Sequence, residues 1–136
     1  MKIEELQIKI QELNIPNNWY YIDENIGRLD NETNIIVSRN NNTIAVYQNV
    51  FNDGITKSFT EESVALDYVF ENLKDLTRLR KINATEGLDG MTTNERLFVS
   101  GLMNEFDIAK LKDKVRAKQI LRCLKLDEQT IREIVK

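Results

Sequence analysis

Histidine is absent from this chain of 136 residues, and the absence excludes several kinds of active site. Without it there is no Ser-His or Cys-His nucleophile system, no His-ligated zinc and no imidazole general base. The only cysteine, Cys123, has no partner for an internal disulfide and no second thiol for a zinc site. The five glycines are scattered and form no phosphate-binding loop. We therefore predict no catalytic residue, no cofactor and no metal, and a protein that is not an enzyme.

Long hydrophobic runs are also missing. No apolar stretch approaches the roughly 20 residues that span a bilayer. The first residues, "MKIEELQIKIQEL", alternate charged and apolar side chains, so they lack the apolar core of a signal peptide. We predict a cytoplasmic protein without a membrane partner.

Charge is distributed unevenly over the chain. The net charge is −3, but residues 1–90 carry nine basic and 15 acidic side chains, whereas residues 91–136 carry ten and seven. This asymmetry fits an acidic face for a basic partner, or two halves that attract each other, or a merely solvated surface.

The first half of the chain changes from helical to strand periodicity. Ile3, Leu6, Ile10 and Leu13 form one apolar stripe of a helix that ends near Asn14, before Pro16. Short segments rich in β-branched and aromatic residues follow: "WYYI", "NIIVS", "TIAVYQN" and "ITKSFT". The turn formers "RNNN" and "NDG" separate the later ones. We predict an antiparallel meander of about four strands.

The second half is predicted to be helical. Thr60 caps a helix that covers the sheet, and a linker at 83–91 separates a sheet domain (1–82) from a C-terminal module (92–136). The module is expected to pack with the sheet domain as one folding unit. The fold class is thus α+β: an N-terminal helix, the meander, the covering helix and a three-helix tail.

The first tail helix begins with a capping-box pattern, Thr92 and Glu95, and is predicted to precede a second helix that starts around Asp113. Its predicted apolar face consists of Val99, Leu102, Met103, Phe106 and Ala109. The next helix, 113–124, carries a basic stripe of Lys114, Lys118 and Arg122. A third begins at Asp127.

Two functional alternatives come from these residues. The basic stripe could neutralise phosphates in a nucleic-acid-binding regulator, although the chain is acidic and no aromatic residue lies within the stripe. A pair of carboxylates could serve a small carboxylate-dependent enzyme. With 22 acidic residues some pair will always lie close together, so the enzyme is the weaker alternative.

Two longer segments resemble a known family. "SFTEESVALDYVFENL" (58–73) looks like the strand-to-helix element of small bacterial immunity proteins from polymorphic and contact-dependent toxin systems. "TTNERLFVSGLMNEFDIAKLKDKVRAKQILRCLKLDEQTI" is similar to a C-terminal helical module of such proteins. The resemblance covers about half of the chain. It implies a non-enzymatic cytoplasmic protein that binds and neutralises one cognate toxin. Nucleic acid is not the expected partner, because the chain is acidic overall.

The predicted partner-binding surface is acidic. Residues 19–73 carry nine acidic and three basic side chains, which suits a basic toxin such as a nuclease. Turn residues are available to a partner because the scaffold does not need them for packing. The predicted contact residues are Asp23, Glu24, Asp30, Glu32, Asp53, Glu61 and Glu62.

Overall fold

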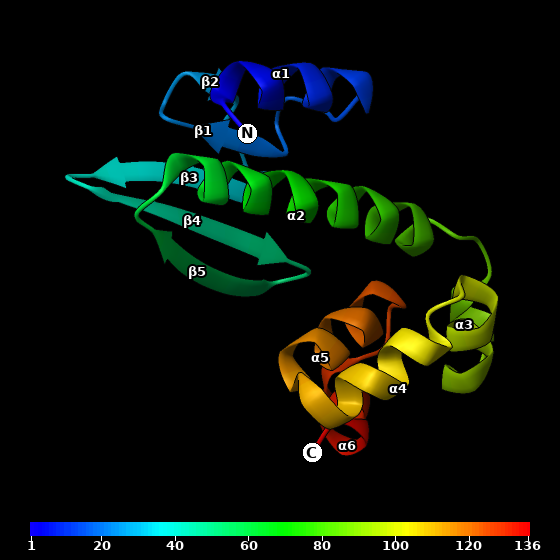
Figure 1. The fold of residues 1–136 in the computed structure, drawn as a ribbon. Coiled ribbons are helices and arrows are strands. Elements are labelled where there is room, and N and C mark those ends of the chain that lie inside the picture. Colours follow the sequence, from blue (N-terminus) through cyan, green and yellow to red (C-terminus); the bar gives the residue numbers. More distant parts are fainter. The chain divides into compact units, whose positions relative to one another are not determined.

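The computed structural model describes residues 1–136 and divides the chain into two compact units, Met1–Thr77 and Arg78–Lys136. We call them the sheet unit and the helical unit (Figure 1). The boundary falls inside the long helix α2 (Glu62–Asn83), which contributes residues to both units. The predicted division into 1–82, 83–91 and 92–136 stays a prediction. None of the helices is both long and apolar enough to cross a membrane.

The sheet unit combines α1 (Ile3–Glu12) and the start of α2 with a five-stranded sheet of order β2-β1-β3-β4-β5 (Figure 1). The strands are β1 (Tyr20–Ile22), β2 (Ile26–Gly27), β3 (Ile35–Asn40), β4 (Thr43–Val50) and β5 (Asp53–Phe59). Neighbouring strands are antiparallel except β1 and β3, which pair in parallel. The α+β class is confirmed, but the all-antiparallel four-stranded meander is wrong.

The unpredicted strand β2 explains the parallel pair. Asp23 and Glu24 take left-handed backbone angles, with φ of 53° and 65°, and turn the chain back from β1 into β2. The loop 28–34 then turns it a second time, so β3 runs in the direction of β1. A strand of only two residues shows no alternation in the sequence, which is why periodicity did not reveal it.

One face of the sheet carries the core of this unit. Side chains alternate between the faces of a strand, so Ile35 and Val37 of β3 point to the same side as Val46 of β4. Both α1 and α2 pack on this side through leucine, isoleucine, valine and alanine. The buried helix residues are Leu6, Ile10, Ala65, Leu66, Val69 and Leu73.

The helical unit contains a short 3₁₀ turn, η1 (Leu88–Gly90), and four further helices. These are α3 (Thr93–Ser100), α4 (Met103–Lys112), α5 (Lys114–Cys123) and α6 (Glu128–Ile134). The predicted capping box is confirmed: Thr92 Oγ1 accepts from the Glu95 amide at 3.2 Å, and Glu95 Oε1 accepts from the Thr92 amide at 3.0 Å.

The prediction of three tail helices is wrong because the first one ends early. Gly101 takes φ of 76°, and its amide donates to the carbonyls of Leu97 and Phe98, which is a helix C-cap that glycine accepts without strain. Since α3 and α4 are separate helices, their apolar faces are not continuous. Val99, predicted as buried, is 54% exposed, and Leu97 is buried instead.

A buried arginine, Arg96, holds the helical unit together at its loops. The side chain is 9% exposed, and its guanidinium donates to three main-chain carbonyls. The acceptors are Met91 at 3.0 Å, Leu124 at 2.9 Å and Asp89 at 3.4 Å. One side chain therefore joins η1, the start of α3 and the end of α5.

A second ionic group lies on the surface of the helical unit. The carboxylate of Glu105 accepts from Arg78 at 3.0 Å and from Arg116 at 2.8 Å. Burial alone would raise the pKa of Glu105, but the hydrogen bonds from Arg78 and Arg116 outweigh it and leave that pKa below its usual value.

We expect Glu105→Gln to remove part of the acid sensitivity of the helical unit. With a folded pKa below the unfolded value of about 4.3, the carboxylate stabilises the fold above that pH. The contribution is lost as the pH falls through the folded pKa. The side chain is about a third exposed, so the effect should not exceed about 1 kcal/mol.

Urea unfolding at about pH 7 and about pH 3.5 measures this difference. Wild type should lose more stability between the two pH values than Glu105→Gln. The matched control is Glu133→Gln, which changes an exposed carboxylate on α6 and should behave as wild type. An equal loss in wild type and Glu105→Gln would contradict the assignment.

Candidate functional site

The seven predicted contact carboxylates lie at two opposite ends of the sheet. The β1–β2 turn, the end of β5 and the start of α2 share one end, which carries Asp23, Glu24, Glu61 and Glu62. The loop 28–34 and the β4–β5 turn share the other, which carries Asp30, Glu32 and Asp53. The structure therefore brings four of the seven together and separates them from the other three. Their role in binding stays a prediction.

The first group, which we call the acidic end, is organised by Arg39 near the end of β3. The Nε of Arg39 donates to Asp23 Oδ1 at 3.0 Å, and its Nη2 donates to Glu62 Oε1 at 3.1 Å. The hydrogen bond with Asp23 is the main cause that raises the pKa of this guanidinium. Glu24 and Glu61 are the chain neighbours of these two acids, so the acidic end carries four carboxylates, two of which pair with Arg39.

At the opposite end of the sheet, Asp30 forms hydrogen bonds within the loop 28–34. Its Oδ1 accepts from the amide of Glu32 at 2.8 Å, and its Oδ2 accepts from Asn18 and Arg28, each at 3.2 Å. The bond from the Glu32 amide is the main reason that the pKa of Asp30 lies below its usual value. Asp30 thus stabilises the loop 28–34.

The acidic end also contains a hollow of about 360 Å³ between β5 and α2. Phe59 and the half-exposed Val64 supply its apolar side, and Glu61 lies at its edge. Ser58 and Thr60 complete the lining. Apolar side chains thus lie beside the carboxylates, a mixture that interfaces between proteins use.

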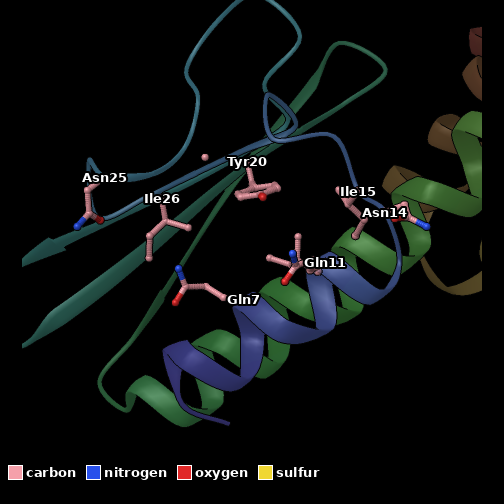
Figure 2. Close-up of a pocket in the computed structure, with 9 residues that line it drawn as sticks. Gln7, Gln11, Asn14, Ile15, Tyr20, Asn25 and Ile26 are labelled. Carbon is pink, nitrogen blue, oxygen red and sulfur yellow. The ribbon is translucent and has the colours of Figure 1, made fainter.

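A groove of about 610 Å³ lies between α1 and the β1–β2 hairpin of the sheet unit. Figure 2 shows Gln7 and Gln11 of α1 on one side, with Tyr20 and Asn25 opposite. Every lining side chain is uncharged. The lining residues are Gln7, Ile10, Gln11, Asn14, Ile15, Tyr20, Asn25, Ile26 and Gly27.

The chemistry of this groove is that of amides. A carboxamide donates through its nitrogen and accepts through its oxygen, as does a peptide bond, so four carboxamides suit an uncharged ligand with both functions. The Tyr20 hydroxyl adds a further polar group, and burial raises the pKa of Tyr20 above its ordinary value. Three isoleucines supply the apolar part of the lining.

The β1–β2 turn connects the groove to the acidic end. Asp23 and Glu24 carry the charge of the turn, and the next residue, Asn25, lines the groove. The Tyr21 hydroxyl donates to the Glu24 carbonyl at 3.0 Å and holds the turn in place. A single partner segment can therefore meet both surfaces.

Sequence reasoning did not identify the groove. The available signal was the spacing of Gln7 and Gln11, four residues apart on the helix beside the buried Leu6 and Ile10. Such glutamines usually face solvent, and only the position of the β1–β2 hairpin makes them part of a concave surface.

In the helical unit one of the three side chains of the basic stripe already forms an ion pair. Lys114, Lys118 and Arg122 lie four residues apart on α5, but the Arg122 Nε donates to Glu128 Oε1 at 2.7 Å. Cys123 is buried and its thiol donates to the Leu79 carbonyl at 3.1 Å, so it packs as a small apolar residue.

No group of three or more Cys, Asp or Glu side chains that could hold a metal ion is present. No family model, curated protein or solved structure matches this chain.

Proposed function

We propose that this chain acts by binding another protein, and that the partner is a cognate toxin domain which it neutralises in the cytoplasm. This is the role of the immunity proteins that two of its segments resemble. The observation that carries the proposal is the β1–β2 turn, where Asp23 and Glu24 stand next to the amide-lined groove. A charged surface beside an uncharged hydrogen-bonding groove suits a basic polypeptide segment.

The acidic end would act mainly on the rate of encounter. Of the four carboxylates at the acidic end, Asp23 and Glu62 pair with Arg39, and the excess negative charge would attract a basic partner such as a nuclease. Charge complementarity of this kind raises the association rate and orients the partner more than it adds affinity.

The groove would act on the lifetime of the complex. The main chain of an inserted segment can donate to and accept from Gln7, Gln11 and Asn25, while an apolar side chain covers the partly buried Ile26. Such contacts form only in the docked complex, so their loss should appear in the dissociation rate.

We expect the double reversal Asp23→Lys with Glu24→Lys to slow association with the toxin domain by roughly tenfold at low salt, with less change in dissociation. Stopped-flow binding to the proposed cognate toxin domain measures both rates. The double reversal should also abolish protection of cells that express the toxin.

The matched control is Glu86→Lys with Asp89→Lys, which makes the same change in net charge at exposed positions of the helical unit. This control should associate at a rate close to wild type. Equal slowing by both pairs would show a general charge effect, and the acidic end would then lose its proposed role.

Removing the groove amides should give the opposite kinetic pattern. We expect Gln7→Ala with Gln11→Ala to speed dissociation about tenfold and to leave the association rate nearly unchanged. Both side chains are exposed, so the fold should survive, which a thermal melt can verify. An unchanged dissociation rate would remove the groove from the interface.

The nucleic-acid-binding alternative has a separate test. Retention of random DNA or RNA on a filter at low salt, lost in Lys114→Glu with Lys118→Glu, would favour it. The pairing of Arg122 with Glu128 engages the third cation of the predicted stripe.

A further inference from the structure

The corner between α4 and α5 exposes apolar side chains that the helical unit does not cover. Ile108 is 59% exposed, Leu111 is 85% exposed and Val115 is 47% exposed. Ile108 and Leu111 are three residues apart on α4, so they are neighbours on the helix surface. Val115 follows in the first turn of α5, directly after the break at Asp113.

Lysines flank these three side chains. Lys110, Lys112 and Lys114 are exposed and take part in no ion pair, while Lys118 lies farther along α5. Two carboxylates also belong to the segment. Asp113 caps α5 by accepting from the Arg116 amide at 3.1 Å, and Asp107 is exposed.

We propose that this corner, residues 107–118, is a docking surface for an acidic protein segment that carries apolar side chains. Lysines pair with carboxylates of the partner, and its apolar side chains cover Ile108, Leu111 and Val115. Exposed leucine and isoleucine contribute binding energy only where a partner removes them from water. The corner is positively charged, whereas the acidic end is negatively charged. The corner therefore suits an acidic partner surface, and the acidic end suits a basic toxin.

The mixture of groups favours a protein over the other anionic partners. The phosphates of nucleic acid would pair with the lysines, but they would leave the aliphatic side chains in water. The corner also lacks the aromatic residues that anchor proteins at membrane interfaces, which disfavours an anionic bilayer. An acidic protein segment can pair with the lysines and also cover the apolar side chains.

Binding to a synthetic helical peptide tests the proposal. The peptide carries leucine at positions i, i+3, i+4 and i+7 and glutamate elsewhere, and a second peptide has lysine in place of glutamate. Fluorescence anisotropy with the full chain should show saturable binding of the acidic peptide only. Amide chemical shifts should move at residues 107–118.

Two variants assign the binding to the corner. Leu111→Asp should weaken it about tenfold, and so should Lys110→Glu with Lys114→Glu, because buried apolar anchors and their charged rim act together. Leu111 is almost fully exposed, so its replacement should leave the thermal melt unchanged. The matched control is Leu29→Asp, an exposed leucine of the sheet unit, which should bind as wild type does.

Three outcomes would overturn the proposal. The first is no binding of the acidic peptide, and the second is equal binding by Leu111→Asp. The third is tighter binding of a short DNA duplex, or of vesicles of phosphatidylcholine and phosphatidylserine, with the same dependence on the lysines. These experiments use no toxin, so their failure leaves the proposed function at the acidic end untouched.

Discussion

Replacing Arg96 by methionine is expected to lower the free energy of unfolding of the helical unit by about 3 kcal/mol. Methionine keeps most of the apolar stem, so the loss comes from the guanidinium and not from packing. The carbonyls of Met91 and Leu124 would lose charge-assisted hydrogen bonds of 3.0 and 2.9 Å, and each buried acceptor left unsatisfied adds its desolvation cost. The bond to Asp89 is longer and contributes less.

Urea unfolding followed by hydrogen exchange would measure this effect and locate it. Protection should fall first in η1 and at the end of α5, which Arg96 joins. Arg96→Lys keeps the charge but lacks the branched guanidinium, so it should lose an intermediate amount. Arg132→Met, at an exposed position on α6, should cost less than about 0.5 kcal/mol. An equally small cost at Arg96 would show that water satisfies the three carbonyls.

The sequence pattern could not assign this role to Arg96. Arginine inside an amphipathic helix normally faces solvent. A buried arginine is usually paired with a carboxylate, and no acidic residue lies three or four positions from Arg96 to suggest such a pair. Its acceptors are main-chain carbonyls, which leave no trace in residue types. The capping box of the same helix was predictable because Thr92 and Glu95 are both side chains and lie three residues apart.

Strand positions were predictable where alternation lasted long enough. The segments around β3, β4 and β5 each hold six to eight residues in strands, and all three were predicted. The strand order was not, because the two-residue β2 reverses the chain before β3 and makes the β1–β3 pair parallel. The end of α3 was also ambiguous in the sequence. Gly101 is compatible with a position inside a helix and with a helix C-cap, and only its φ shows that it is the cap.

The predicted contact residues show the same limit. Charge counts identified the acidic stretch, but the topology decides which carboxylates meet. Asp23 and Glu62 are 39 positions apart in the sequence and share Arg39, whereas Asp30 lies closer to Asp23 in the sequence but at the opposite end of the sheet. The pairing of the strands brings Asp23 and Glu62 together and separates Asp30 from Asp23. Residue types alone do not predict that pairing.

Gly27→Ala is expected to destabilise the sheet unit by about 3 kcal/mol or more. A Cβ on Gly27 would lie 2.1 Å from the carbonyl oxygen of Tyr20 and 2.7 Å from its Cδ2, and the oxygen belongs to the main chain. The position also has φ of 84°, which costs an L-residue about 1–2 kcal/mol. Relief requires the β1–β2 hairpin to move, and that hairpin forms one side of the groove.

Two other glycines separate the conformational cost from the clash. Gly87 has nearly the same φ, 85°, with no atom within 4 Å of a built Cβ, so Gly87→Ala should show the conformational cost alone. Gly90 has neither constraint, and Gly90→Ala should leave stability nearly unchanged. Urea unfolding should therefore rank the costs Gly27, Gly87 and Gly90 from largest to smallest.

If Gly27→Ala costs no more than Gly87→Ala, the hairpin is not held against Tyr20 as described. Chemical shifts at Tyr20 and Asn25 would then show whether the groove had already opened, and with it the surface on which the proposed partner docks.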